Sequence, residues 1–259
     1  MKPEEFRETY GPIALVTGAS SGIGLAFAEE LAARGFDLVL VARRTDRLEA
    51  LAQRLLSSCG VKTRVIGADL SDPDAPARLL EETEGSDIGL VVSNAGFNIK
   101  GAFESKDASA MAKMLTVNCH APMQLAHGFI PRLKARGRGG LVFTASVEGL
   151  IGCPYSTAYS ASKALVISLG EGLWGELQGT GVDVLTLCPG ATESEATVNM
   201  PSAANLQSAA DVARLTLDNL REGPTFVPHQ HYRDMFEGLR TMPRRDALTR
   251  MAQSMKDLA

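Results

Sequence analysis

The stretch Thr17-Gly18-Ala19-Ser20-Ser21-Gly22-Ile23-Gly24 joins a short apolar run at 13–17 to an amphipathic segment at 23–34. Three glycines at this spacing allow a tight turn and let a pyrophosphate approach a helix N-terminus, where free N–H groups favour anions. The stretch therefore predicts a strand, a dinucleotide-binding turn and a helix. Because such a turn can also be purely structural, the rest of the chain must support this interpretation.

A second interpretation of the same residues is a hydrolase, because Gly18-Ala19-Ser20-Ser21-Gly22 also matches the G-x-S-x-G nucleophile elbow. It would need a later acid and a histidine, for which His229 and His231 are candidates. The elbow of α/β hydrolases follows several strands, whereas this motif follows the first apolar run of the chain. The hydrolase interpretation is therefore disfavoured.

Beyond this motif, β-branched apolar runs alternate with segments of helical period, which predicts βαβ units and a parallel sheet. The runs are apolar throughout, as expected of a sheet covered on both faces. We expect an α/β fold with one Rossmann-like, doubly wound domain over 1–259 and about seven parallel strands. The expected strands are 13–17, 38–42, 64–68, 88–93, 141–145, 182–187 and 225–227, and the expected helices are 23–34, 47–56, 76–82, 108–133, 155–178 and 209–221.

Composition and charge exclude several functional classes. With 45% hydrophobic and 22% charged residues, the chain of 259 residues has the composition of a folded domain. Its 26 basic and 30 acidic residues give a net charge of −4, so there is no general basic field to attract nucleic acid or anionic membranes. Neither an apolar span of bilayer length nor an export signal is recognisable, which predicts a cytoplasmic protein.

The cysteine and histidine patterns give no metal site. Four cysteines lie far apart with no C-x-x-C pair, as expected of reduced thiols. His229 and His231 form an H-x-H pair without a third ligand pattern, and His120 and His127 are interpreted as structural or pocket-lining.

Tyr159 and Lys163 stand four residues apart in an expected helix, so their side chains should share one face, one turn apart. An isolated phenol has a pKa of about 10, and a tyrosine that exchanges protons near neutrality needs a nearby cation, which Lys163 can supply. Ser146 follows the fifth expected strand, at the sheet edge where α/β sites form. Its hydroxyl could hold a substrate oxygen.

With these motifs the chain resembles the short-chain dehydrogenase/reductase family over residues 12–192. One small departure is Ser93-Asn94-Ala95-Gly96 where the family often has Asn-Asn-Ala-Gly, and the second asparagine is retained. The matching positions are Thr17-Gly18 through Gly24, Asp69, Asn94-Ala95-Gly96, Asn118, Ser146, Tyr159 with Lys163, and Pro189-Gly190 with Thr192.

The resemblance implies hydride transfer between a nicotinamide and a carbonyl or alcohol, without a metal. It makes Tyr159 the general acid/base and Ser146 the partner of the reacting oxygen. Lys163 would lower the tyrosine pKa and bind the nicotinamide ribose. Asn118 would sit at a helix irregularity and hold a water that links the lysine to solvent; its alternative role is to satisfy a backbone group.

The resemblance also implies a set of cofactor contacts, spread over the carboxyl ends of the strands. They are Gly18, Ser20, Ser21, Gly22, Ile23, Gly24, Arg43, Arg44, Asp69, Leu70, Asn94, Ala95, Gly96, Tyr159, Lys163, Pro189, Gly190 and Thr192.

The choice of nicotinamide is indicated by the end of the second expected strand. An acid there would accept bonds from the ribose 2′-OH, but this strand is followed by Arg43 and Arg44, which suit a 2′-phosphate. NADP(H) is favoured and NAD(H) stays open. We expect Arg43 to be the phosphate contact and Arg44 to belong to a solvated charge cluster.

Substrate selection is expected in the loops after the fourth, fifth and sixth strands. These loops are mostly apolar, with Phe97, Leu150, Ile151 and Tyr155 within or beside them, which suggests a medium-sized or hydrophobic carbonyl compound. The expected pocket residues are Phe97, Glu148, Cys153 and Tyr155. Glu148 could orient a polar or cationic substrate group, or be a solvated loop acid. The polar segment 191–208 is expected to form a lid. The Arg- and Met-rich tail 229–259 has no expected place in the fold.

Three functions remain open at this stage. The favoured one is an NADP(H)-dependent carbonyl reductase or alcohol dehydrogenase; the others are an NAD-dependent alcohol dehydrogenase and a nucleotide sensor without turnover. The expected partner is a small molecule. A homodimer or homotetramer, paired through helices 108–133 and 155–178, is also expected.

Overall fold

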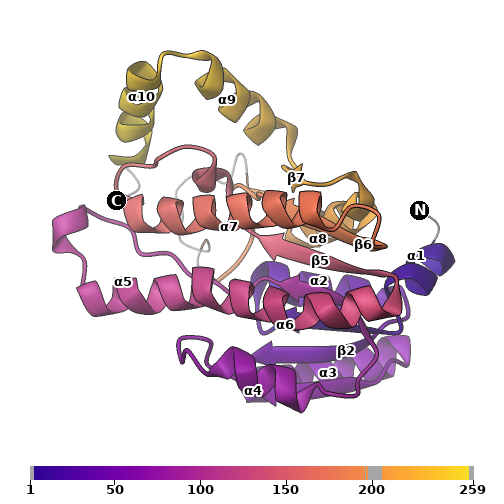
Figure 1. Ribbon diagram of the computed structural model, residues 1–259. Coiled ribbons are helices and arrows are strands. Elements are labelled where there is room, and N and C mark those ends of the chain that lie inside the picture. Colours follow the sequence, from indigo (N-terminus) through magenta and orange to yellow (C-terminus); the bar gives the residue numbers. More distant parts are fainter. Residues whose placement is uncertain (1–2, 196, 198–205, 257–259) are drawn as a thin grey trace.

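A computed structural model describes residues 3–195, 197 and 206–256. Seven parallel strands form one twisted sheet in the order β3-β2-β1-β4-β5-β6-β7, which confirms the predicted Rossmann-like sheet (Figure 1). The chain order reverses between β1 and β4, and ligands of open α/β sheets bind at such a switch point. The strands are β1 (Ile13–Thr17), β2 (Asp37–Ala42), β3 (Thr63–Gly67), β4 (Ile88–Ser93), β5 (Gly139–Thr144), β6 (Val182–Leu187) and β7 (Thr225–Phe226).

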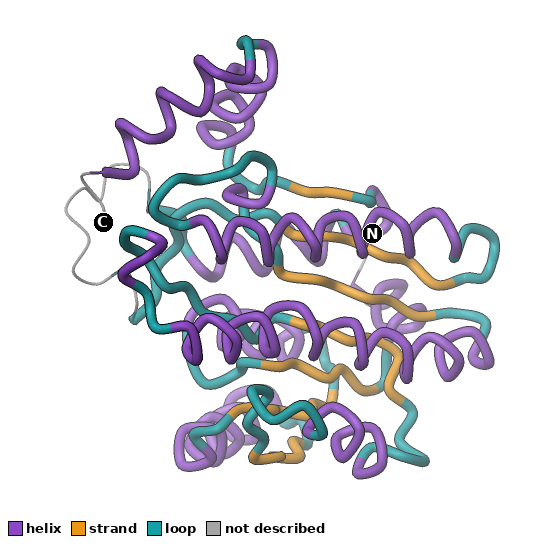
Figure 2. Tube along the Cα trace, turned by 60° about the vertical axis from the view of Figure 1, so that its left-hand side comes forward, coloured by secondary structure: helices purple, strands orange, loops and turns teal. Residues whose placement is uncertain are grey.

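Helices cover both faces of this sheet, as the purple coils on either side of the orange strands show in Figure 2. One core lies under α1 (Pro3–Tyr10), α2 (Gly22–Ala33), α3 (Thr45–Cys59) and α8 (Ala209–Asp218). A second core lies under α4 (Ala75–Glu82), α6 (Ala121–Arg136) and α7 (Thr157–Glu176). The central strands β1, β2, β4, β5 and β6 are buried between the two cores, as predicted, whereas the edge strands β3 and β7 are partly exposed.

Three of the expected helices differ from the structure by more than small shifts of their ends. The expected helix 209–221 is divided into α8, which ends at Asp218, and the 3₁₀ turn Leu220–Glu222. The expected helix 108–133 is α5 (Ala108–Leu115), a π-helical turn Thr116–His120, and α6. The expected helix 155–178 is α7, which spans Thr157–Glu176. Tyr155 has a positive φ of 61°, which a right-handed helix does not allow, so the helix starts after it. The expected strand 64–68 lies one residue earlier, at Thr63–Gly67.

The tail without an expected place forms α9 (Gln230–Thr241) and α10 (Arg244–Lys256), the yellow helices in Figure 1. Both are amphipathic, and they bury Phe236, Leu239 and Met251 in the same core as α6 and α7. Helix α1 was not expected either; its Tyr10 hydroxyl donates to Asp183 of β6 at 2.6 Å.

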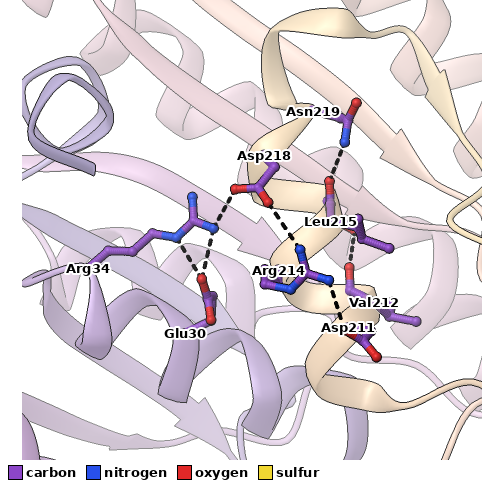
Figure 3. A network of polar contacts seen from close by, with 9 residues as sticks. Glu30, Arg34, Asp211, Val212, Arg214, Leu215, Asp218 and Asn219 are labelled. Atoms are coloured by element: carbon purple, nitrogen blue, oxygen red, sulfur yellow. Dashed lines mark hydrogen bonds and ion pairs between the residues drawn. The ribbon is translucent and has the colours of Figure 1, made fainter. Parts of the chain in front are cut away.

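Helices α2 and α8 are also joined by a polar network at their surface (Figure 3). Arg34 lies between Glu30 and Asp218, at 2.8 and 2.7 Å, while Arg214 contacts Asp211 at 2.9 Å. Arg34 is partly buried, whereas the Arg214 pair is exposed, and exposed pairs contribute little stability individually. Apolar residues of both helices also belong to one core. Within the described residues, no helix has the length and apolar character needed to cross a bilayer.

Candidate active site

The glycine turn is held against the end of β4 by Thr17. The Thr17 hydroxyl accepts bonds from the backbone N–H groups of Asn94 and Ala95, at 2.9 and 3.1 Å. The Asn94 amide donates to the Thr17 carbonyl at 3.2 Å. The glycine turn and the Asn94-Ala95-Gly96 motif are therefore hydrogen-bonded to each other at the switch point of the sheet.

The turn has no room for side chains at its inner positions. Gly18 has a φ of 70°, and a Cβ on Gly24 would lie 2.2 Å from the Gly18 carbonyl oxygen. Ser21 precedes α2 with no capping bond from its side chain, so the first N–H groups of the helix are not used by the usual cap. A bare backbone turn at an uncapped helix start fits a dinucleotide pyrophosphate.

Arg44, rather than Arg43, contacts the glycine turn. Its guanidinium donates to the Ser20 hydroxyl at 3.0 Å and to the Ser21 hydroxyl at 2.9 Å. It also pairs with Glu195, at 2.8 Å. Arg43 is exposed, and its charge helps hold the pKa of Asp69 below its usual range, after the larger effect of the Ser71 backbone N–H. Both arginines thus lie near the site, on different sides.

The four expected catalytic side chains come from three regions of the chain. Ser146 follows β5, Tyr159 and Lys163 lie on α7, and Asn118 lies in the π-helical turn. Lys163 is 3% exposed; its ammonium donates to the Thr144 carbonyl at 2.7 Å and lies 5.6 Å from the centre of the Tyr159 ring. The i, i+4 spacing therefore places the lysine beside the tyrosine.

Burial shifts the pKa values of these two groups in opposite directions. It lowers the pKa of Lys163 to about 8, because the ammonium leaves water. It raises the pKa of Tyr159, and the Glu148 carboxylate raises it further, while a hydrogen bond with Ser146 opposes the shift. The direction is opposite to the sequence-based expectation for Tyr159, because burial and the Glu148 carboxylate raise its pKa.

The helix irregularity expected at Asn118 is the π-helical turn Thr116–His120. Its side-chain amide donates to the Phe97 carbonyl at 3.0 Å and to the Ser162 hydroxyl at 3.1 Å, and its oxygen accepts from the Phe97 N–H at 3.1 Å. Asn118 therefore satisfies backbone groups, the alternative role considered for it, and ties the loop after β4 to α7. A water held by Asn118 stays a prediction.

The segment that follows β6 contacts helix α9 at Gly190 and Ala191. A Cβ on Gly190 would lie 2.1 Å from the Tyr232 ring of α9, whose hydroxyl accepts from the Ala191 N–H at 3.1 Å. Thr192 forms a parallel bridge with Gln207. Within the expected lid 191–208, residues 196 and 198–205 lie outside the described residues, so its closure stays a prediction.

The four expected substrate residues have different surroundings. Phe97 is exposed, and Tyr155 is half-buried with its carbonyl accepting from the Lys106 ammonium at 3.2 Å. Cys153 is 2% exposed, within the core, and burial raises its pKa to about 12. Glu148 has one carboxylate oxygen buried without a partner among the described residues. Glu148 as a whole is half-buried, so it is not a fully solvated loop acid.

Metal ligands do not gather in the described part of the chain: it contains no group of three or more His, Cys, Asp or Glu side chains arranged around an ion. The Nδ1 of His229 accepts from the His231 N–H at 3.3 Å as α9 begins. His120 contacts the Pro73 carbonyl at 3.2 Å.

Sequence reasoning missed two contributors to this region. Tyr232 lies in the tail, where no motif marks it, and its contact with Gly190 depends on how α9 packs. Glu195, which pairs with Arg44 and Arg47, lies in the expected lid, and its acidic side chain was not considered a partner for these arginines.

Comparison with known proteins agrees with this geometry. The short chain dehydrogenase family profile matches residues 12–205. A 7beta-hydroxysteroid dehydrogenase of Clostridium sardiniense is 33% identical over 98% of this chain and 99% of its own. Among solved structures, one from a study of 7beta-hydroxysteroid dehydrogenase stereoselectivity has a TM-score of 0.90 at 27% identity, covering 95% of this chain and 98% of its own. A short-chain dehydrogenase from Sphingobium yanoikuyae, in complex with NADPH, has a TM-score of 0.81 at 34% identity, covering 89% and 93%.

This chain therefore belongs to the short-chain dehydrogenase family. It is an NAD(P)-dependent oxidoreductase.

Proposed function

We propose that the chain transfers hydride between NADP(H) and a bulky, mainly apolar carbonyl compound or its alcohol, with Tyr159 as general acid/base. The observation that carries the proposal is the placement of Tyr159 and Lys163 on one turn of α7, with Ser146 bonded to the tyrosine. The likeness to two 7beta-hydroxysteroid dehydrogenases, over 98% and 72% of this chain, supports a ketone of steroid size.

Tyr159, Ser146 and Lys163 have different proposed roles in this reaction. A bound nicotinamide supplies the hydride. The raised pKa of Tyr159 keeps the proton on its hydroxyl at neutral pH, which is the form that can protonate a carbonyl oxygen. The Ser146 hydroxyl orients that oxygen, and Lys163 places a positive charge beside the phenol as it loses its proton.

The direct test measures the loss of NADPH absorbance with a steroid ketone, an aryl ketone and a small keto acid. Turnover of the first two, with little of the third, is the expected result. Binding of NADPH without turnover of any carbonyl compound, or of the matching alcohols with NADP, would favour the nucleotide sensor instead.

The cofactor preference gives a second prediction. Arg43→Ala and Arg44→Ala should each weaken NADPH binding by about tenfold to a hundredfold, because each removes a charge-assisted contact with the 2′-phosphate. Arg44 is available for this because its exposed pair with Glu195 is weak. Dissociation constants for NADPH and NADH provide the measurement, with exposed Arg54→Ala on α3 as control. Equal losses for both cofactors, or a wild-type preference for NADH, would contradict the prediction.

The pH dependence gives a third prediction. Lys163 has a pKa of about 8, so its ammonium is present below that pH and lost above it. The kcat/KM for ketone reduction should therefore be level below pH 8 and fall as pH rises through it, since this ratio reports the free enzyme. Lys163→Met should have low activity that does not fall near pH 8. The control Lys113→Met, on α5, should keep the wild-type fall in kcat/KM near pH 8. A wild-type profile that stays level to pH 10 would show that the lysine charge is not needed.

A further inference from the structure

Glu148 combines features that a structural surface acid does not need. It is the middle residue of the short 3₁₀ helix Val147–Gly149, two residues after Ser146, and its backbone N–H donates to the Ser146 hydroxyl at 3.1 Å. The Oε2 atom is buried and, among the described residues, has no hydrogen-bond partner. The residue as a whole is half-buried. Keeping one acceptor oxygen away from water without a partner is unfavourable, so this placement has a cost for the fold.

The backbone of Glu148 is held in place by its surroundings. A Cβ on Gly149 would lie 2.7 Å from the Lys163 backbone carbon, so the 3₁₀ helix is packed tightly against α7 at the turn that carries Lys163. On the other side, the Cys153 thiol donates to the Glu148 carbonyl at 3.7 Å. The side chain of Glu148 therefore starts from a fixed point beside α7.

The groups around the carboxylate do not neutralise it. Its charge acts on the Tyr159 hydroxyl and the Cys153 thiol, and raises the pKa of both. The Lys163 ammonium donates to the Thr144 carbonyl. The exposed Lys100 lowers the pKa of Cys153, but by less than Glu148 raises it. The carboxylate thus lies within electrostatic range of the Tyr159 hydroxyl, two residues after Ser146 in the chain, and one of its acceptor oxygens is unused among the described residues.

We propose that Glu148 is a specificity residue that accepts a hydrogen bond from a donor group on the substrate, placed close to the reacting carbonyl. This inference rests on the proposed function and narrows it to carbonyl compounds with a neighbouring hydroxyl or ammonium group. A substrate without the donor would leave the carboxylate buried and unpaired, and polar sites of this kind discriminate strongly against such analogues.

The test compares matched ketones with the wild-type enzyme and NADPH. The pair is 2-hydroxy-1-phenylethanone (the hydroxyketone) and acetophenone. A third ketone, 2-amino-1-phenylethanone (the aminoketone), tests an ammonium group as the donor. The wild type should favour the hydroxyketone over acetophenone by roughly tenfold or more in kcat/KM, mainly through KM. A larger preference for the aminoketone would identify an ammonium group as the preferred donor.

Two variants separate this role from an indirect one. Glu148→Leu should reduce the preference for the hydroxyketone to near one, and Glu148→Gln should keep part of it while losing the preference for the aminoketone. Glu176→Leu, an exposed acid at the far end of α7, should keep the full preference. Thermal melts show that each variant is folded, and the ratio of two substrates on one preparation does not depend on the active fraction.

The outcomes are distinct. If acetophenone and the hydroxyketone are reduced equally by the wild type, or if Glu148→Leu changes both by the same factor, Glu148 acts on Tyr159 alone and the inference is wrong while the proposed function stands. Turnover of no ketone would overturn the proposed function and this inference with it.

Discussion

Tyr159→Phe is expected to lower kcat for ketone reduction by about a thousandfold, because the phenyl ring keeps the packing and removes the only hydroxyl proposed to protonate the substrate. The NADPH dissociation constant should change by no more than a few-fold, since the proposed cofactor contacts come mainly from the glycine turn and the arginines. Steady-state kinetics and a cofactor titration measure the two effects.

A matched control is Tyr10→Phe, which removes a phenol hydroxyl from the Asp183 contact between α1 and β6. This variant should lose stability and keep its kcat. If Tyr159→Phe retained ordinary activity, another group would have to be the acid.

Gly24→Ala is expected to have the largest effect on folding. The new Cβ would lie 2.2 Å from the Gly18 carbonyl and 2.5 Å from the Asn94 amide nitrogen, so the backbone of the turn must move. Overpacking of this kind costs up to about 3 kcal/mol. A chain of this size should then lose roughly 6–12 °C in Tm. NADPH affinity should fall as well, because the same backbone is the proposed binding site of its pyrophosphate.

The control for this variant is Gly172→Ala on the exposed side of α7, where a Cβ would meet nothing within 4 Å. This change should raise the free energy of unfolding by about 0.5–1 kcal/mol, because it reduces the freedom of the unfolded chain. Equal Tm values for Gly24→Ala and the wild type would show that the turn adapts to a side chain.

The local patterns that predicted the fold are those whose outcome depends on few distant contacts. The run Ile13–Thr17 forms β1 with the expected bounds, and the glycine turn follows it, because apolar period and glycine spacing are local properties. The tail was not predicted, because α9 and α10 are defined by the core that they cover. No local pattern distinguishes them from a surface extension.

The candidate site was predicted in its residue types more fully than in its electrostatics. The spacing of Tyr159 and Lys163 indicated that they share a helix face, but the pKa of the tyrosine depends on burial and on Glu148, which spacing does not report. Likewise, Arg43 and Arg44 are equivalent in sequence. Only the path of the chain after β2 decides that Arg44 meets Ser20 and Ser21.

The π-helical turn Thr116–His120 makes the number of residues in this helix matter as much as their identity. A π turn holds one residue more than an α turn, and removal of one residue would let α5 and α6 join with better hydrogen bonds. Each residue of an α-helix rotates the chain by about 100°, so that deletion would turn Asn118 away from Phe97 and Ser162. A deletion or insertion within residues 116–120 would thus change the direction in which the Asn118 side chain points. Homologous chains with a regular helix here would have to anchor the loop after β4 by other means.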